Sequence, residues 1–467
     1  MVKKILATII SCFILVGLMV IYYWRDIQYQ PESPDLIHYF LILPIVITMV
    51  LLSPWLLYTA YQHHQQKKQH ALQSEQDAEQ HLSEALPTVM EGQWLTLNLY
   101  GAGAYSALGE NDAILQGIQS FTSPQLDFNL LNLYGLPILS YRIAALDEQL
   151  QGEDADKLHF LSSRQQRIMA LIHQQIEQHT ELLSSIVEHL KQSSLFYESQ
   201  HLHEYRMHPA WVERSFREGD QDLDSTQTQV EQVDRLDRFN LHIFLSEDVT
   251  HTWNDVSSNE SIQAALYELG ILPQQLHIEY HYLSATSTTQ YLLELLERIQ
   301  NQTYEISLII AGDSEINQDI IDEKLWEDSG YIPAEFVSSF CLANPALQLT
   351  QRYPLKTFRL VAHQNHLDQL LKELDMHDLP QYQAEAPFVL VLEDGTAIKA
   401  VKKLEQFFAG SPVEQHHYLY CKPVAGHTQN LAKIFGLMLG AHWPNRQVVF
   451  IYEDNFKAFI QDFPEMA

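Results

Sequence analysis

Two long uncharged stretches near the start of the chain restrict its fold more than any other feature. Residues 5–24 and residues 37–61 carry no charged side chain, and each is long enough to cross about 30 Å of hydrocarbon as a helix. Tyrosine and tryptophan side chains at their ends suit the aromatic belts of a bilayer. No small-residue cleavage site follows the first stretch, which argues against a signal peptide. We predict a two-helix transmembrane hairpin over residues 1–61; a hairpin buried in a protein core is the alternative.

The charges beside these stretches predict an orientation. Lys3 and Lys4 precede the first stretch, Lys67 and Lys68 follow the second, and the turn between the stretches holds one arginine and three acidic residues. Because positive charge collects on the cytoplasmic side, we expect both termini in the cytoplasm and the turn outside a bacterial inner membrane. Residues 62–90 are rich in glutamine and histidine, which predicts a polar, helical tether to a cytoplasmic domain.

Composition restricts the partners of that domain. The chain has 467 residues and a formal net charge of −31. Beyond residue 90 no lysine and arginine cluster is present from which a nucleic-acid-binding face could form, so we exclude nucleic acid as a partner. The three cysteines, Cys12, Cys341 and Cys421, are scattered in the sequence, which indicates no disulfide framework and favours a reducing compartment.

After residue 90, strand-like apolar runs alternate with segments whose apolar residues have helical spacing. This alternation predicts an α/β fold with a largely buried sheet. A strand is expected at 93–103, running into a glycine turn, and helices are expected at 110–121 and 162–194. Residues 217–238 are polar and acidic and predict a surface loop or weak helix. The further strand-like runs are 239–245, 276–283, 305–312, 358–363, 387–393, 416–422 and 446–453, and helix-like runs at 288–300 and 366–376 lie between some of them.

Four short motifs follow one another along this part of the chain. They are "GAGAYSALG" after a strand (101–109), "SAT" before a helix (284–286), "DGT" after a strand (394–396), and Lys422 followed by "GHT" (426–428). Their order and spacing resemble the landmarks of ketosynthases, the condensing enzymes of fatty-acid and polyketide synthesis. The glycine-rich loop that closes that family's sequence is missing here.

The resemblance covers roughly residues 93–455 and implies a fold. Residues 91–467 are expected to form a thiolase-like layered α/β domain made of two pseudo-repeated halves. A helical insertion around 150–236 is expected over the entrance of the pocket. The family's members pair through a shared sheet edge, so a homodimer is also implied.

The same resemblance implies that the chain has lost the groups needed for the condensation reaction. Thr286 stands where the family has its cysteine nucleophile, and Asp394 stands where it has the first of two histidines; Lys422 and His427 match. A threonine hydroxyl is a poor nucleophile without a base, and a carboxylate would repel a developing oxyanion. We therefore expect these four residues to line the vestigial pocket of an inactive enzyme. Two alternatives stay open: a hydrolytic triad of Thr286, Asp394 and His427, and purely structural roles for Lys422 and His427.

Other side chains with reactive or metal-binding groups are weaker candidates. Cys341 is either a displaced nucleophile or a buried structural thiol, and nothing near it in the sequence resembles a base. The histidines have the ligand type for zinc, but their spacings fit no standard site, so we predict no metal and no cofactor. The two clusters weighed are His201, His203 and His208, and His416 and His417.

A membrane-anchored protein that has lost the catalytic groups of its family is expected to have another function, and we predict that it binds a protein. The segments "LNLYGAGA" to "ILQGI", "YGLPILSYRI" and the "GHT" region are similar in outline to the type VI secretion lipase-adaptor family. That resemblance implies an adaptor that loads a lipase effector for secretion. The alternatives are an acyl-transfer or condensing enzyme of lipid metabolism and a divergent hydrolase using Thr286. An acyl-carrier protein as partner would favour the condensing enzyme.

Overall fold

A computed structural model describes most of the chain beyond residue 93. The described residues are 18–20, 22, 25–26, 94–150, 161–206, 233–327, 330–362, 381, 387–392, 398–421 and 430–463. The tether and nearly all of the two apolar stretches lie outside these residues, so the transmembrane hairpin stays a prediction. Within the described residues no helix combines the length and the apolar character needed to span a membrane. Residues 90–467 form one compact unit, separate from residues 1–89.

One large mixed sheet organises this unit. Its strand order is β11-β10-β12-β13-β9-β1-β8-β7-β5-β6, with the short β2 beside β1. The strands are β1 (Trp94–Ser106), β2 (Gly109–Glu110), β5 (Arg238–Ser246), β6 (Leu276–Leu283), β7 (Glu305–Ser314), β8 (Glu335–Ala343), β9 (Lys356–Ala362), β10 (Val389–Val391), β11 (Tyr418–Tyr420), β12 (Val449–Tyr452) and β13 (Phe456–Asp462).

The sheet divides into two halves with the same topology. The first half reads β6-β5-β7-β8-β1 and the second reads β11-β10-β12-β13-β9. In each half the first three strands run parallel, and the remaining two continue by antiparallel pairing. The halves join where β1 pairs with β9. The two pseudo-repeated α/β halves expected from the sequence are thus confirmed by the strand order.

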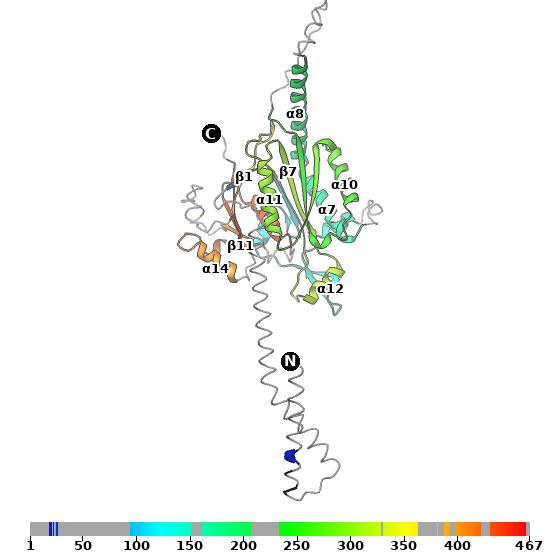
Figure 1. Cartoon of the computed structure of the whole chain (residues 1–467), viewed down its shortest axis with the longest axis vertical. Coiled ribbons are helices and arrows are strands. Elements are labelled where there is room, and N and C mark those ends of the chain that lie inside the picture. The colour runs from blue at the N-terminus through cyan, green and yellow to red at the C-terminus, as the bar shows by residue number, and fades with distance from the viewer. Residues whose placement is uncertain are drawn as a thin grey trace, which may run out of the picture. The chain divides into compact units, whose positions relative to one another are not determined.

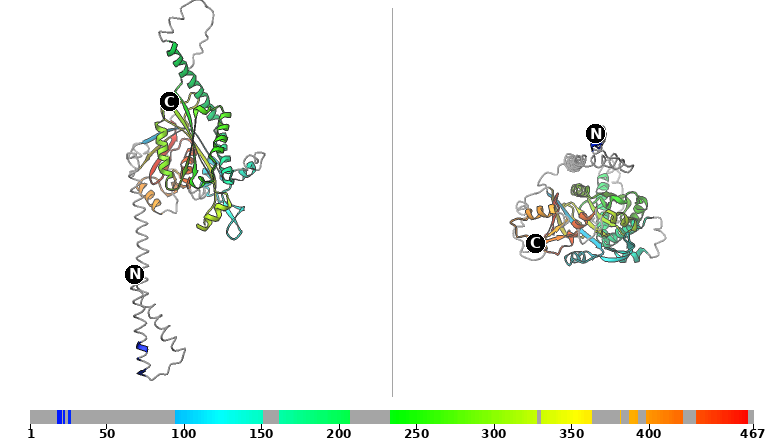
Figure 2. Two further views of the ribbon diagram at one scale, coloured as in Figure 1. Left: turned by 45° about the vertical axis from the view of Figure 1, so that its right-hand side comes forward. Right: turned by 90° about the horizontal axis from the view of Figure 1, so that it is seen from below.

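Helices cover both faces of each half. α11 (Thr288–Asn301) follows β6, and its counterpart α16 (Ala432–Leu439) follows β11; α16 contacts β8 of the first half and β10 of the second. Their apolar side chains share one core with the inner faces of both halves. Separate cores lie on the outer faces, under α7 (Ser163–Gln178) and α10 (Asp255–Glu268) in the first half and α14 (Ile398–Phe407) in the second. Figures 1 and 2 show α14 on one side and α7 and α10 on the other, so the layers run helix, sheet, helix, sheet, helix.

The predicted elements agree with the structure in most places. All seven strand-like runs after residue 238 contain strands. The run 276–283 matches β6 at both ends, the other six have shifted ends, and the helix-like run 288–300 is α11. The expected helix at 110–121 is α4 (Asp112–Gln119). The sequence reading missed the strands β8 and β13 and the separate hairpin of β3 and β4. The predicted helix at 366–376 lies outside the described residues. The remaining elements are β3 (Gln125–Leu131), β4 (Pro137–Ser140), α5 (Ala144–Leu150), α10 (Asp255–Glu268), α12 (Gln318–Glu327) and α14 (Ile398–Phe407).

The predicted glycine turn at the end of the first strand is wrong. β1 continues through Gly101 and Gly103 to Ser106, and a bulge lies between Leu99 and Gly101. A Cβ on Gly101 would lie 2.6 Å from Leu182 Cδ2, which real Cβ contacts do not allow. These glycines therefore allow helices to approach the sheet closely and do not reverse the chain.

The predicted helix at 162–194 is two helices, α7 (Ser163–Gln178) and α8 (Thr180–Arg206). They meet at His179, whose Nε2 lies 2.7 Å from Ser339 Oγ on β8. α7 packs directly on β7, β8 and β1, and Ile168, Leu171 and Ile172 are fully buried there. α7 is therefore part of the core of the unit.

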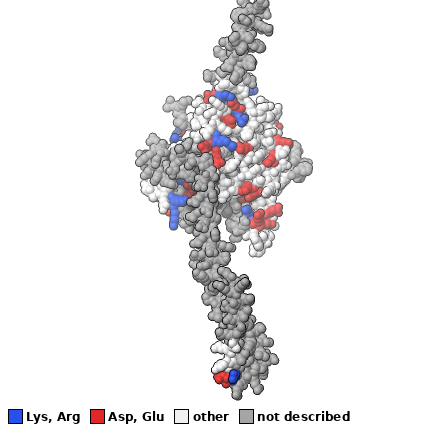
Figure 3. Space-filling view, in the orientation of Figure 1, with Lys and Arg blue, Asp and Glu red and all other residues white. Residues whose placement is uncertain are grey.

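Charged side chains of both signs are interspersed on the face of the unit that Figure 3 shows. Acidic residues outnumber basic ones in the whole chain by 59 to 28, so the surface carries a negative excess. A net negative charge of this kind keeps a protein soluble and does not determine its fold.

Candidate functional site

The predicted nucleophile position lies in a turn between β6 and α11. Ser284 and Ser287 close the turn, because Ser287 Oγ accepts a hydrogen bond of 3.1 Å from the Ser284 backbone N–H. Thr286 is exposed at the tip, and Ser284 Oγ, 3.2 Å from its hydroxyl, is its one hydrogen-bond neighbour among the described residues. Thr286 thus stands two residues before α11, which is buried on one face, and the ketosynthase resemblance implies a position of this kind.

The turn meets the segment that precedes α16. Thr288 Oγ1 lies 2.7 Å from the backbone oxygen of Asn430. The Asn430 amide in turn donates to Ser246 Oγ, at the carboxyl end of β5, over 2.8 Å. The structure therefore brings the Thr286 turn beside the residues that directly follow the "GHT" motif, at the end of parallel strands where α/β proteins place ligands.

The other three predicted site residues, Asp394, Lys422 and His427, lie outside the described residues. Their convergence with Thr286 on one vestigial pocket therefore stays a prediction. In the described part of this region no imidazole or carboxylate lies within hydrogen-bond distance of the Thr286 hydroxyl. A threonine hydroxyl needs such a base to attack a substrate.

The two cysteines of the folded unit are buried. Cys341 lies on β8 and is fully buried, and Cys421, just after β11, is 2% exposed. Burial raises the pKa of the Cys421 thiol to about 12, and burial also raises the pKa of Cys341. Of the two interpretations of Cys341, the buried structural thiol is confirmed, because a reactive cysteine needs an accessible thiolate.

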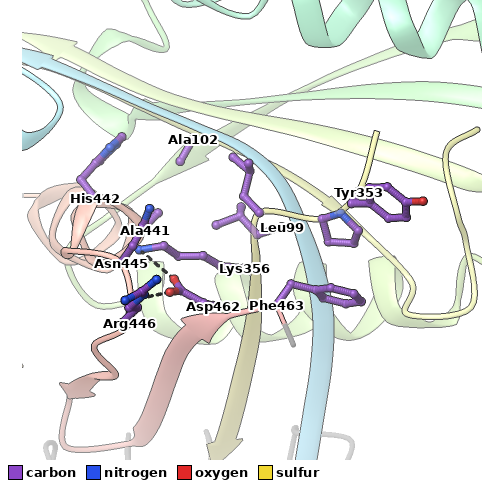
Figure 4. Close-up of a pocket in the computed structure, with 12 residues that line it drawn as sticks. Leu99, Ala102, Tyr353, Lys356, Ala441, His442, Asn445, Arg446, Asp462 and Phe463 are labelled. Atoms are coloured by element: carbon purple, nitrogen blue, oxygen red, sulfur yellow. Dashed lines mark hydrogen bonds and ion pairs between the residues drawn. The ribbon is translucent and has the colours of Figure 1, made fainter. Parts of the chain in front are cut away.

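A separate cavity of about 1330 Å³ opens where β1 passes the start of β9 and the end of β13. Figure 4 shows Lys356, Arg446 and Asp462 pointing toward one another inside it. Lys356 Nζ donates to the backbone oxygen of Trp443 over 2.6 Å and lies 4.0 Å from Asp462 Oδ1. Burial lowers the pKa of Lys356. Thr286 is not among the described residues that line this cavity.

The histidine clusters weighed from the sequence do not form a metal group in the described residues. His417 Nδ1 accepts from the Glu414 backbone N–H over 2.9 Å, and His416 lies 3.6 Å from Glu414. His208 and the side chains of His201 and His203 lie outside the described residues.

A different group, His242, Glu279 and His281, gathers three metal-binding atoms. Sequence analysis missed it. One signal was available: Glu279 and His281 are two residues apart on a strand, so both point to the same face. His242 comes from another strand, 37 residues before Glu279 in the chain. Nothing in the sequence pattern indicates that these two strands are neighbours in this register.

No protein-family model and no curated protein sequence matches the chain. Solved structures are similar to it. The ketosynthase from module 6 of the bacillaene synthase of Bacillus subtilis 168 shares 8% identity at a TM-score of 0.45, over 80% of this chain and 73% of that one. An oxazolomycin ketosynthase domain of Streptomyces albus JA3453 shares 8% at a TM-score of 0.46, over 79% and 75%.

A thiolase is also similar. The peroxisomal 3-ketoacyl-CoA thiolase of Saccharomyces cerevisiae shares 12% identity at a TM-score of 0.29, over 48% of this chain and 83% of that one. That enzyme is described as five-layered and built from two core domains of identical topology. At such identities a likeness concerns the fold alone, so what this chain does has to be argued from its own residues.

Proposed function

We propose that the chain is a catalytically inactive, ketosynthase-like protein that is anchored in a bacterial inner membrane and binds a protein partner. The four sequence landmarks and the two halves of equal topology support the ketosynthase-like scaffold. The apolar stretches 5–24 and 37–61 support the anchor, with both termini in the cytoplasm. Thr286 in the place of a cysteine, without a described base beside it, supports inactivity.

One observation carries the binding role: the hairpin of β3 and β4 exposes a large apolar surface. Phe128 is 75% exposed, Tyr134 is 88% exposed, and Trp326 on the adjoining α12 is 80% exposed. Isolated exposed apolar side chains are ordinary, but a contiguous group of them marks an interaction site. The other exposed members of the hairpin are Leu126, Leu131, Leu133, Leu136 and Leu139.

The hairpin is held firmly to the unit, so this surface is a built feature. Leu130 packs from its inner side against Ile316 and Ile321. The Asp127 carboxylate accepts from Ser140 Oγ over 3.0 Å and pairs with Arg142. Gln318 of α12 bonds both the backbone N–H and the backbone oxygen of Leu131, over 2.9 and 2.8 Å. A fixed apolar surface loses little entropy when a partner covers it.

The partner we propose is a secreted lipase effector loaded for type VI secretion. The segment "YGLPILSYRI", one of those that resemble the lipase-adaptor family, contains β4 and half of the hairpin turn. A lipase has its own apolar surface at the entrance for its substrate, and such a surface suits the exposed apolar side chains of the hairpin, whose one carboxylate, Asp127, is buried. Burying apolar area against apolar area is the main driving force of association.

The test is an affinity pull-down of the full-length, detergent-solubilised protein from its own cells, with mass spectrometry. We expect a lipase at near-equal amounts, and we expect Phe128→Ser with Tyr134→Ser to weaken its retention by about thirtyfold or more, as for interface hot spots. Tyr267→Ser is the matched control, because Tyr267 is an aromatic side chain 61% exposed on α10.

The enzyme alternative gives a different result in the same experiment. Recovery of acyl-carrier protein or of a covalently bound acyl chain, lost in Thr286→Ala or His427→Ala, would overturn the adaptor proposal. Retention of the lipase by both of these variants would support it.

A further inference from the structure

Two neighbouring strands at the edge of the first half place three metal-binding side chains on one face. His242 lies on β5, and Glu279 and His281 lie on the edge strand β6. In the parallel register His242 stands beside Glu279, and Phe244 stands beside His281. The face is the inner one, because Phe244 belongs to the central core beneath α11.

The three ligand atoms have the mutual distances of a metal's coordination shell. His242 Nδ1 lies 3.2 Å from His281 Nε2 and 3.4 Å from Glu279 Oε2, and His281 Nε2 lies 3.8 Å from the same oxygen. A point equidistant from three atoms so spaced lies about 2.0 Å from each, the bond length of zinc to imidazole nitrogen or carboxylate oxygen. No described backbone or side chain has to move to bring the donors together.

Packing holds both imidazole rings in this orientation. His242 and His281 are each 2% exposed. The ring of His281 lies between Phe244 and Tyr291 of α11, with centroid distances of 5.1 and 5.4 Å. The outward nitrogens, His242 Nε2 and His281 Nδ1, have no hydrogen-bond partner among the described residues. Each ring therefore makes its polar contacts through the nitrogen that faces the other two donors.

The three side chains also perturb one another's pKa values. Burial lowers the pKa of His242, and it lowers the pKa of His281 to about 4. The hydrogen bond from His242 lowers the pKa of Glu279 to about 2, with His281 and Arg298 adding to the effect.

We propose that His242, Glu279 and His281 bind a divalent transition-metal ion, with zinc the best fit. Two histidines and one glutamate are a known zinc ligand set, and three protein ligands leave a fourth position for water. Glu279 is the half-buried member, so the ion would enter from its side. The proposal is independent of the partner-binding role.

Arg298 of α11 is the positioning residue of this site. Its Nη2 lies 2.8 Å from Glu279 Oε2, and its Nη1 lies 3.5 Å from Oε1. An ion on Oε2 would share that oxygen with Arg298 Nη2, and the guanidinium would still orient the carboxylate, in the way that outer partners orient metal ligands. A metal-free network of Arg298, Glu279 and His242 is the competing explanation for the same geometry.

The experiment is a zinc titration of full-length, untagged protein in detergent after removal of metals with a chelator. We expect the parent protein to bind one zinc ion per chain. In Glu279→Gln or His281→Gln this zinc ion should be lost, or the Kd for zinc should rise at least about tenfold. Zinc should raise the melting temperature of the parent protein and not of Glu279→Gln, because only the folded state holds the three ligands together. Cobalt in place of zinc should give a tetrahedral visible spectrum that is lost in the same variants.

Two controls decide the result. His416→Gln removes an imidazole 48% exposed elsewhere on the unit and should leave the zinc Kd unchanged. Glu279→Gln keeps the shape of a half-exposed side chain, and circular dichroism reports whether it folds. A folded Glu279→Gln protein with the parent's zinc affinity, or a parent protein that binds no zinc, overturns the proposal.

Discussion

The two halves of the sheet share a strand order, but the helices on their outer faces differ: α7 buries polar side chains beside its apolar ones, whereas none of the described polar side chains of α14 is buried. On the first half, α7 turns a polar stripe toward the strands, made of Arg164, Arg167, Gln175 and His179, all buried. On the second half, Leu404 and Phe407 of α14, with Phe408 just after it, pack in an apolar core. The topology therefore does not depend on the chemistry of the outer layer.

The polar stripe of the first half is fully paired. Arg164 Nη2 lies 2.8 Å from Asp313 Oδ1 at the end of β7. Arg167 pairs with Glu335 at the start of β8, whose carboxylate also accepts from the Ile143 backbone N–H and from Ser314 Oγ, over 2.9 and 2.6 Å. Buried charges persist only when they are paired and hydrogen-bonded in this way.

The outer face of the second half is held by aromatic rings. Phe450 on β12 is fully buried, and its ring centroid lies 5.4 Å from Phe408 and 4.7 Å from Phe459. Contacts between aromatic rings tolerate small shifts of the helix along the strands. Ion pairs are more demanding, because each charged side chain of the helix has to stand opposite its partner on the strand. The comparison teaches that α7 adds register-specific ion pairs to its apolar packing, whereas α14 is held by apolar contact area.

The largest effect should come from breaking the charge contact of the first half. Arg167→Met leaves the Glu335 carboxylate buried without its cation, which should lower the free energy of unfolding by about 3–5 kcal/mol. The measurement is urea unfolding of the full-length protein by circular dichroism. Lys403→Met is the control in the second half, because Lys403 is 61% exposed and its pair with Asp454 should be worth about 1 kcal/mol or less. Equal losses in the two variants would contradict the comparison.

A pH dependence should follow from His179 at the junction of α7 and α8. Burial lowers the pKa of His179 to about 4 in the folded protein, against about 6.5 in the unfolded chain. The unfolded state then binds more protons between these values, so the His179 contribution is complete above pH 6.5 and is lost as the pH falls toward 4. His179→Gln keeps a polar side chain without titration, and it should remove up to about 3 kcal/mol of this pH dependence. Unfolding curves at several pH values test this; unchanged slopes in the variant would refute it.

The smallest of the three effects concerns the approach of the first half's helices to β1. Gly101→Ala would place a Cβ 2.6 Å from Leu182 Cδ2, which should cost about 1–3 kcal/mol. Gly312→Ala on β7 is the matched control, because its Cβ would meet Val337 Cγ2 at an ordinary 3.4 Å. Thermal melting compares the two; a Gly101→Ala protein as stable as Gly312→Ala would show that α8 moves away freely.

The sequence by itself determined the elements whose signal is local. Apolar runs of strand length located β5, β6 and β7, and helical spacing located α11, because both patterns involve residues close together in the chain. The resemblance to ketosynthases correctly implied two halves of equal topology. It also placed Thr286 at the start of α11, while the parts assigned to Asp394, Lys422 and His427 stay predictions.

Tertiary structure decided everything that depends on which strands are neighbours. Gly101 resembles a turn residue until α8 is seen packed against it, and the buried arginines of α7 resemble a solvated face until Asp313 and Glu335 are seen opposite them. The same holds for His242 and His281, which meet only because β5 and β6 pair in one register. A one-residue shift in that register would point the histidines to opposite faces, and no pattern within either strand fixes it.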